Sequence, residues 1–396
     1  MSETKYLIPL SSPDITEREI QAVTDVMKTG TLSLGPKLPE FEKAITDYCG
    51  SKHGVAVNSG TSGLHLTVRA LGLKPGDEVI TTSFSFIASS NCVIFEGAKP
   101  VFIDIDPVNM NFDIDKIEGA ITEKTKAIVA VHAFGMPVDM VKVMEVAKKH
   151  NLAVIEDACE AIGAMIKDGD SWKMAGTFGD CGLYAFYPNK QITTGEGGII
   201  ITDNDEIARL CVSMRNQGRD AGMGWLAHAR LGYNYRLSDM SCALGTVQVS
   251  RLGEILPKRA EVAARYTKLF TEEIPEIVLP CPDPENLRRS WFVYVIQLPK
   301  AYTGDQRNEL ITHLRSLGIG CNQYFSPIHL QPFYQKEYGW KRGDLPVTEY
   351  MGDHSMSIPF FNKLKEENLT GRPSAKPSLK SASKSPWKAT WAELGM

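Results

Sequence analysis

The sequence predicts an α/β protein, in which a mainly parallel sheet is covered by helices and followed by a smaller α+β domain. Two observations carry this prediction. Short β-rich runs alternate with helical stretches between residues 55 and 202, and a long helical stretch over 238–273 then leads into mixed strand and helix. Such alternation is typical of parallel sheets, because each return to the same edge needs a crossover. With 396 residues the chain is long enough for a large and a small domain.

The individual elements follow from periodicity and from capping residues. The first helix is expected over residues 14–29, where apolar side chains recur on one stripe and Asp14 or Thr16 can cap the start. Further along, β-rich runs bounded by turn residues predict strands. The expected strands of the large domain are Val55–Val57, Glu78–Thr81, Pro100–Ile103, Ala127–Val131, Ala153–Ile155, Gly182–Tyr187 and Gly198–Thr202, with helices over Leu64–Leu71 and Val141–His150.

The chain divides into three expected regions. Residues 1–250 form an N-terminal segment and the large domain, and residues 251–370 form the small domain, with a strand at Trp291–Leu298 and a helix near Asp305–Leu317. Residues 371–396 are rich in Ser, Lys, Ala and Pro, which predicts a disordered basic tail. A basic helical stripe is the alternative, although prolines oppose it. An altered reading frame or an artificial extension would also account for the abrupt change.

Composition excludes several classes of protein. The chain is 43% hydrophobic and 23% charged with a net charge of −4, which argues against nucleic acid or an anionic membrane surface as a partner. No apolar run approaches the roughly 20 residues of a membrane span, and the amino terminus lacks a signal-peptide pattern. Eight scattered cysteines without a Cys-x-x-Cys pair indicate reduced thiols, not disulfides or a metal site. These features predict a cytoplasmic enzyme without a metal.

Lys190 is the first candidate for chemistry. It lies in a turn between two expected buried strands, where Pro188 restricts the backbone and later glycines allow a tight reversal. A lysine held partly away from water in such a turn can form a Schiff base with a carbonyl compound. A lysine that merely caps a strand turn is the alternative.

The segment Asn58–Leu64 is a candidate phosphate site. Its small and hydroxyl residues follow an expected strand and open a helix, so backbone N–H groups and hydroxyls gather at the positive helix end. The glycine spacing matches neither the P-loop nor the dinucleotide fingerprint. An ordinary capped helix would give the same pattern.

Asp157 and Phe86 complete a set of four features. Asp157 ends an expected buried strand, where it could pair with a protonated ring nitrogen; a helix cap or a buried structural carboxylate are the alternatives. Phe86 could stack on a flat ring, although taken alone it is typical of a core residue. A phosphate site, a stacking ring, an acid and a lysine are what pyridoxal 5′-phosphate requires.

With these residues, the chain resembles the DegT/StrS-type sugar aminotransferases, pyridoxal-phosphate enzymes of the aspartate aminotransferase fold (type I). The resemblance runs from about Pro9 to Phe361. Its motifs are specific for the family and poorly specific for the substrate. They are Asn58–Leu64, Glu156–Ala161, Lys190–Gly198 and Leu231–Leu237, with further family-like segments at Val131–Asp139 and Pro327–Pro332.

The resemblance implies a role for each matched residue. Lys190 would hold the cofactor covalently and later move the proton between the substrate carbon and the cofactor. Asp157 would pair with the pyridine nitrogen, and Phe86 would stack on the ring. The residues implied for the phosphate are Gly60, Thr61 and Ser62.

Two positions depart from the family pattern, and a third position, which matches it, implies a dimer. Glu160 occupies the position where the family usually has Gln or His near the ring oxygen, and a carboxylate there would repel that oxygen unless protonated or turned away. Ala185 replaces a serine that contacts the phosphate in many members. Asn234 matches a residue that reaches the phosphate in the neighbouring subunit, which implies shared active sites; a loop residue bonded to its own backbone is the alternative.

The expected function is transfer of an amino group, with glutamate as the expected donor, to a nucleotide-linked keto-deoxysugar in the synthesis of cell-surface polysaccharide or glycan precursors. Tyr324 and His329 are the candidate substrate residues, whereas His132 is expected to be a packing residue. Alternatives are a cyclitol or another non-nucleotide ketone as substrate, or a regulator that binds the cofactor without turnover. Some relatives have histidine in place of the lysine and dehydrate the sugar, which Lys190 argues against.

Overall fold

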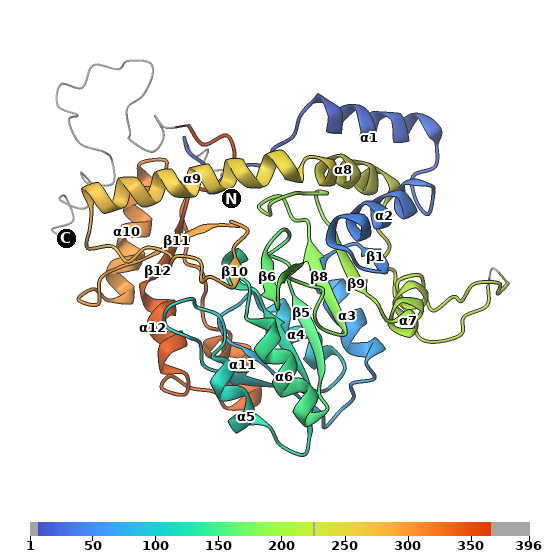
Figure 1. Cartoon of the computed structure of the whole chain (residues 1–396), viewed down its shortest axis with the longest axis horizontal. Coiled ribbons are helices and arrows are strands. Elements are labelled where there is room, and N and C mark those ends of the chain that lie inside the picture. Colours follow the sequence, from blue (N-terminus) through green and yellow to red (C-terminus); the bar gives the residue numbers. More distant parts are fainter. Residues whose placement is uncertain (1–6, 225, 366–396) are drawn as a thin grey trace.

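The computed structural model describes residues 7–224 and 226–365. Its centre is a seven-stranded sheet in the order β1-β9-β8-β5-β4-β2-β3 (Figure 1). Neighbouring strands are parallel, except that β9 runs antiparallel to both β8 and β1. The predicted mainly parallel sheet is therefore confirmed. The strands are β1 His53–Val57, β2 Glu78–Thr82, β3 Lys99–Ile103, β4 Thr125–Val131, β5 Ala153–Asp157, β8 Cys181–Ala185 and β9 Gly198–Thr202.

Helices cover both faces of this sheet, and alternate residues of each strand point to opposite layers. In β9, Ile199 and Ile201 pack toward α2 and α6, whereas Ile200 packs toward α3, α4 and α7. Two hydrophobic layers therefore enclose the sheet, as expected for parallel strands. The helices of this part are α1 Glu17–Thr29, α2 Lys37–Cys49, α3 Gly60–Ala70, α4 Ala88–Phe95, α5 Ile117–Ala120, α6 Met140–His150 and α7 Asp205–Arg215.

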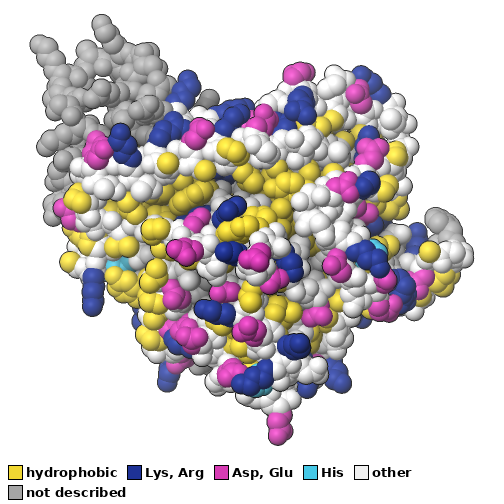
Figure 2. Space-filling view, in the orientation of Figure 1, with side chains coloured by type: hydrophobic (Ala, Val, Ile, Leu, Met, Phe, Trp, Pro, Cys, Tyr) yellow, Lys and Arg dark blue, Asp and Glu magenta, His cyan; other side chains and the backbone are white. Residues whose placement is uncertain are grey.

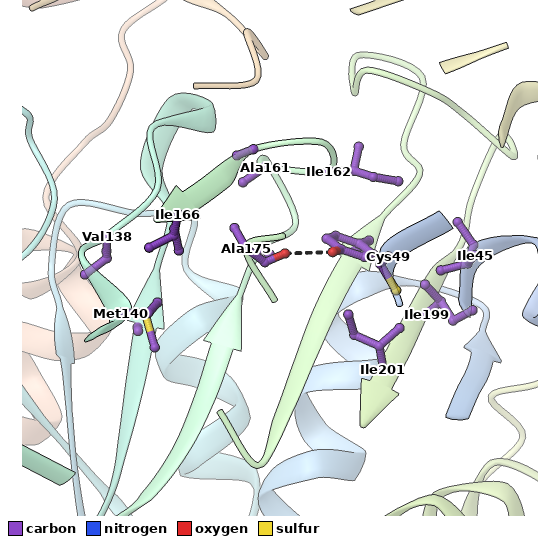
Figure 3. Packing of buried hydrophobic residues seen from close by; sticks show 14 of the residues in the cluster. Ile45, Cys49, Val138, Met140, Ala161, Ile162, Ile166, Ala175, Ile199 and Ile201 are labelled. Carbon is purple, nitrogen blue, oxygen red and sulfur yellow. Dashed lines mark hydrogen bonds between the residues drawn. The ribbon is translucent and has the colours of Figure 1, made fainter. Parts of the chain in front are cut away.

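The layer that contains α2 shows how closely the core is filled. Ile199 and Ile201 of the sheet lie beside Ile45 and Cys49 of α2 in Figure 3. The Ala175 carbonyl in this layer accepts a hydrogen bond of 2.6 Å from the Tyr184 hydroxyl. Because both groups are buried, this bond satisfies polar atoms that water cannot reach.

The prediction of one continuous helix over residues 238–273 is wrong, because the helix is interrupted at one residue. The structure has two helices, α8 Asp239–Ser250 and α9 Leu252–Glu273, separated at Arg251 with φ −102° and ψ 0°. The Arg251 side chain is buried and paired with Glu19 and Asp14, so this junction also anchors the start of the chain. In Figure 1, α9 extends from the large sheet to the C-terminal part.

The C-terminal part has its own core around a two-stranded antiparallel sheet. Ile8 pairs with Ile319, so the first described residues pack against this part. A further three-stranded sheet, β10-β6-β7, escaped prediction because its strands are only two to four residues long. The remaining elements are β6 Met165–Asp168, β7 Ser171–Met174, β10 Leu287–Arg288, β11 Tyr294–Gln297, α10 Gly304–Ser316, α11 Pro332–Tyr338, α12 Pro346–His354 and β12 Ser355–Ile358.

Three further expectations concern the domain boundary, the basic tail and membrane-spanning helices. The break at Arg251 falls beside the expected domain boundary, but the division into domains remains a prediction. The expected basic tail, residues 371–396, lies outside the described residues. Across the described ranges, no helix has the length and apolar character needed to cross a membrane.

The buried ion pair of Glu19 with Arg251, which attaches α1 to the α8–α9 junction, is sensitive to acid. Burial alone would raise the pKa of Glu19, but hydrogen bonds from Thr16, Arg251 and Gln248 outweigh burial and lower the pKa from 4.5 to about 2. A lowered folded-state pKa means that the stabilisation is present above pH 4.5 and is lost as the pH falls toward 2, on the order of 2 kcal/mol.

We expect Glu19→Gln to lower the free energy of unfolding at neutral pH and to flatten its decline below pH 4.5. Urea unfolding at a series of pH values measures both effects. Glu17→Gln is the matched control, because Glu17 is exposed on the same helix. Identical acid profiles for the Glu19→Gln variant and the wild type would contradict the prediction.

Candidate active site

A cavity of about 520 Å³ lies at the carboxyl ends of the parallel strands. Val131, Asp157 and Ala185 line it, and they are the last residues of β4, β5 and β8. Carboxyl ends of neighbouring parallel strands meet at one edge of the sheet, which is where open α/β sheets bind ligands. The fold therefore brings together residues from segments far apart in the sequence.

The turn that carries Lys190 is fixed by its own hydrogen bonds. Thr193 Oγ1 donates to the Phe186 carbonyl at 2.9 Å, and the Thr194 amide donates to the same oxygen at 3.0 Å. Gly195 has φ +82°, a conformation that favours glycine. Because β8 and β9 are antiparallel neighbours, this turn keeps Lys190 at the cavity.

The Lys190 amine lies between a carboxylate and an aromatic ring. Its Nζ is 3.2 Å from Glu160 Oε1 and 4.1 Å from the centroid of the Phe292 ring, and its side chain is 13% exposed. A cation above a ring face is attracted electrostatically. The amine is thus oriented from two sides and is not the exposed charge of an ordinary turn lysine.

Asp157 is buried and lines the cavity. Its Oδ2 accepts a hydrogen bond from Ser89 Oγ at 2.6 Å, and its Oδ1 accepts one from the Cys159 amide at 3.2 Å. These two donors, one from α4 and one from the chain after β5, fix the orientation of the carboxylate. An acid so placed can pair with a protonated ring nitrogen of a ligand.

The phosphate candidates separate into two groups. Ser59 caps α3, and Gly60 and Thr61 line the cavity at the helix N-terminus. Ser62 is not among the cavity-lining residues; its hydroxyl is 2.6 Å from Asn58 Oδ1, so it stabilises the turn from within. A Cβ at Gly60 would lie 2.9 Å from the Ala185 Cβ, so glycine keeps this cradle open.

Phe86 is exposed at the cavity, with 62% of its surface accessible. The interpretation of Phe86 as a core residue is therefore excluded. Tyr324 also lines the cavity, and its hydroxyl accepts a hydrogen bond from Asn189 Nδ2 at 3.4 Å. Asn189 lines the cavity too, and its buried Oδ1 has no hydrogen-bond partner among the described residues.

Glu160 is turned toward the lysine. Its Oε2 accepts a hydrogen bond from the Phe134 amide at 2.9 Å, while its Oε1 faces Lys190. Burial raises the pKa of this carboxyl, although the Lys190 charge partly offsets that effect.

Two candidate residues, His329 and Asn234, do not line the cavity. His329 is fully buried, with its ring nitrogens 2.7 Å from Ser83 Oγ and 3.1 Å from Glu349 Oε1. Its expected contact with substrate is therefore replaced by a link between the loop after β2 and the C-terminal part. Asn234 is exposed and does not line the cavity of its own subunit.

His132 is a packing residue, as expected. Its Nε2 is 3.0 Å from Glu156 Oε2, and its Nδ1 accepts a hydrogen bond from the Val138 amide. Sequence reasoning missed Ser89, Asn189 and Phe292. Asn189 adjoins Lys190 and could have been found by its position, whereas Phe292 belongs to the C-terminal part and carries no motif.

The donor set fits a phosphorylated pyridine aldehyde. Lys190 offers an amine for the aldehyde, Asp157 an acid for the ring nitrogen, and the start of α3 a cradle for the phosphate. Within residues 7–224 and 226–365, no group of three or more His, Cys, Asp and Glu side chains is arranged to hold a metal. The fold and the site define an enzyme of the pyridoxal-phosphate class.

Comparison with known proteins names the family. The model of the DegT/DnrJ/EryC1/StrS aminotransferase family matches residues 13–371, and the chain belongs to this family. It is a pyridoxal-phosphate-dependent aminotransferase of the type I fold.

Two relatives and one solved structure illustrate the similarity. The chain is 37% identical to GDP-perosamine synthase of Caulobacter vibrioides over 363 residues, 91% of this chain and 95% of that protein. It is 36% identical to the spore coat polysaccharide biosynthesis protein SpsC of Bacillus subtilis over 379 residues, 93% and 96% of the two chains. The PLP form of Spr1654 from Streptococcus pneumoniae superposes with a TM-score of 0.84 at 28% identity, covering 91% of this chain and 95% of that one.

We expect Phe86→Ala to weaken binding of pyridoxal 5′-phosphate about tenfold, roughly 1.4 kcal/mol, because the pyridine ring of the cofactor loses the phenyl ring expected to stack on it. Titration of the cofactor-free protein, followed by absorbance, measures this affinity. Phe95→Ala is the matched control, since Phe95 is 52% exposed but lies outside the cavity lining. Equal affinities for both variants would show that Phe86 does not stack on the ring.

Proposed function

We propose that this enzyme transfers the amino group of an amino acid, with glutamate as the expected donor, to the keto group of a nucleotide-linked deoxysugar. The cavity that joins Lys190, Asp157 and the start of α3 carries the proposal. GDP-perosamine synthase and SpsC support the substrate class, because their names place them in nucleotide-sugar and polysaccharide chemistry. We propose the same role here, in the supply of polysaccharide or glycan precursors.

Each residue around Lys190 has a proposed task. Lys190 holds the cofactor covalently, then is released and moves a proton on and off the substrate carbon as acid and base. When bound, the cofactor supplies an electron sink for that carbon. Asp157 keeps the ring nitrogen protonated, and the ring face of Phe292 attracts the Lys190 nitrogen whenever that nitrogen carries the proton.

The opening of the cavity is proposed to recognise the sugar. Tyr187 is exposed there, and an aromatic face of this kind packs well against the apolar face of a sugar ring. Tyr324 presents a hydroxyl for the hydroxyl groups of the sugar, and its hydrogen bond to Asn189 Nδ2 orients that hydroxyl. We do not assign His329 a substrate contact, because it is buried in its own hydrogen-bond network.

A homodimer with shared sites is part of the proposal. The connection between α7 and α8 extends from the body in Figure 1. Asn234, near the end of this connection, is exposed and is not among the residues that line its own cavity. The chain also exposes apolar side chains that a second subunit could cover, and Figure 2 shows patches of hydrophobic side chains among polar and charged ones. The exposed apolar residues of this connection are Met223, Leu226 and Leu231, and those before α2 are Leu32 and Leu34.

We further propose a cytoplasmic location. All eight cysteines are free in the structure, and Cys159 lies at the cavity itself. A reducing compartment preserves such thiols.

Replacing Lys190 tests the function directly. We expect Lys190→Ala to abolish the Schiff-base absorbance that the wild type acquires with pyridoxal 5′-phosphate, and to reduce turnover by at least about 10³-fold, since the anchor and the proton carrier are lost together. Lys336→Ala, at an exposed lysine, is the control. A wild type that stays colourless with cofactor would overturn the proposal.

The substrate is identified in a second step. The wild type is first converted to its amine-loaded form with glutamate, and its reoxidation by nucleotide-linked keto sugars is compared with reoxidation by free keto sugars and keto-cyclitols. We expect nucleotide-linked keto sugars to react fastest. Preference for a keto-cyclitol would replace the proposed substrate, and absence of any half-reaction with bound cofactor would favour a regulator.

Shared active sites predict complementation between two defective variants. Lys190→Ala and Asn234→Ala subunits, mixed under conditions that exchange subunits, should form hybrids in which one site has both Lys190 and Asn234. We expect such mixtures to regain wild-type cofactor affinity at up to half of the hybrid sites. Sedimentation at twice the chain mass checks the dimer, and mixtures no better than the average of the two parents would rule out sharing.

A further inference from the structure

Glu160 has surroundings that are unusual for a charged carboxylate. It is 7% exposed, and its two oxygens meet one backbone N–H, from Phe134, and one cation, Lys190. The partner that balances its charge is therefore the residue assigned to bind the cofactor. A buried ion pair loses its balance when one partner gives up its charge.

The remaining ionisable neighbours do not replace that cation. Asp157 adds a negative charge that disfavours ionisation of Glu160. Cys159 and Tyr324 are the other titratable groups that interact electrostatically with it, and burial raises the pKa of both, so they stay neutral. With Lys190 neutral, none of these protein side chains offers an ionised Glu160 a balancing positive charge.

We propose that Glu160 accepts the proton that the Lys190 ammonium must lose to attack the cofactor, and that it stays a neutral carboxylic acid while the cofactor is attached. This inference rests on the proposed role of Lys190. The transfer is balanced within the pair: an N–H bond of the ammonium breaks, an O–H bond forms on Oε1, and the amine keeps the electron pair it needs as nucleophile. The heavy atoms are 3.2 Å apart, within reach for a direct transfer.

A neutral Glu160 also removes the conflict with the family pattern. Gln or His at this position can donate a hydrogen bond, whereas a carboxylate cannot. A protonated glutamic acid donates one as well, so Glu160 gains the hydrogen-bonding ability of glutamine only after taking the proton. Glu160 thus acts as a base before the cofactor is attached and as a hydrogen-bond donor afterwards.

Infrared difference spectroscopy of the cofactor-loaded minus the cofactor-free protein tests the inference, since a carboxylic acid has a C=O stretch well separated from carboxylate bands. We expect a positive carboxylic-acid band in the wild type that shifts when glutamate carries a ¹³C carboxyl and stays in place when aspartate is labelled instead. Glu160→Gln should lose this band. Glu196→Gln, at another acidic residue of the cavity wall, should retain it.

The Schiff-base absorbance of the same samples separates the two proposals. If the wild type forms the Schiff base but shows no glutamic-acid band, Glu160 stays ionised and the inference is overturned while the proposed function stands. A band that survives in Glu160→Gln overturns it equally. If no Schiff base forms at all, the role of Lys190 fails and the inference fails with it. The isotope shift uses the wild type alone, so the test does not depend on the folding of a variant.

Discussion

The reversed direction of β9 is the constraint on which the site depends. A parallel partner for β8 would require a crossover helix, and the chain after β8 would leave the carboxyl edge of the sheet. Because β9 is antiparallel, the connection over residues 186–197 starts and ends at that same edge. Lys190 therefore sits among residues that the neighbouring parallel strands and their following segments deliver, including Asp157 and Gly60.

The sequence contained most of this arrangement, because the large sheet is built from runs whose residues are buried on both faces. Such strands are nearly continuous in Val and Ile and are easily recognised. Asp157 ends such a run and Lys190 lies in the connection that follows another, and both line the cavity. A residue at the carboxyl end of a recognisable parallel strand can therefore be assigned to the ligand-binding edge of the sheet from the sequence.

What escaped prediction depends on contacts between distant segments. Nothing near Phe292 in the chain indicates that its ring lies against Lys190, and a phenylalanine such as Phe86 gives no local sign that it will be exposed. The break at Arg251 was hidden because the buried partners of that arginine lie more than two hundred residues earlier. His329 looked accessible in a proline-rich loop, yet its ring bonds place it in the interior.

His329 influences the site without touching it. Its amide and ring both bond to Ser83 Oγ, and the Ile328 amide donates to the Ser83 carbonyl at 2.9 Å. Ser83 lies three residues before Phe86, so the C-terminal part braces the ring-stacking wall from behind. The segment that carries Phe86 is therefore tied to the C-terminal part, so a displacement of that part would move one side of the cavity with it.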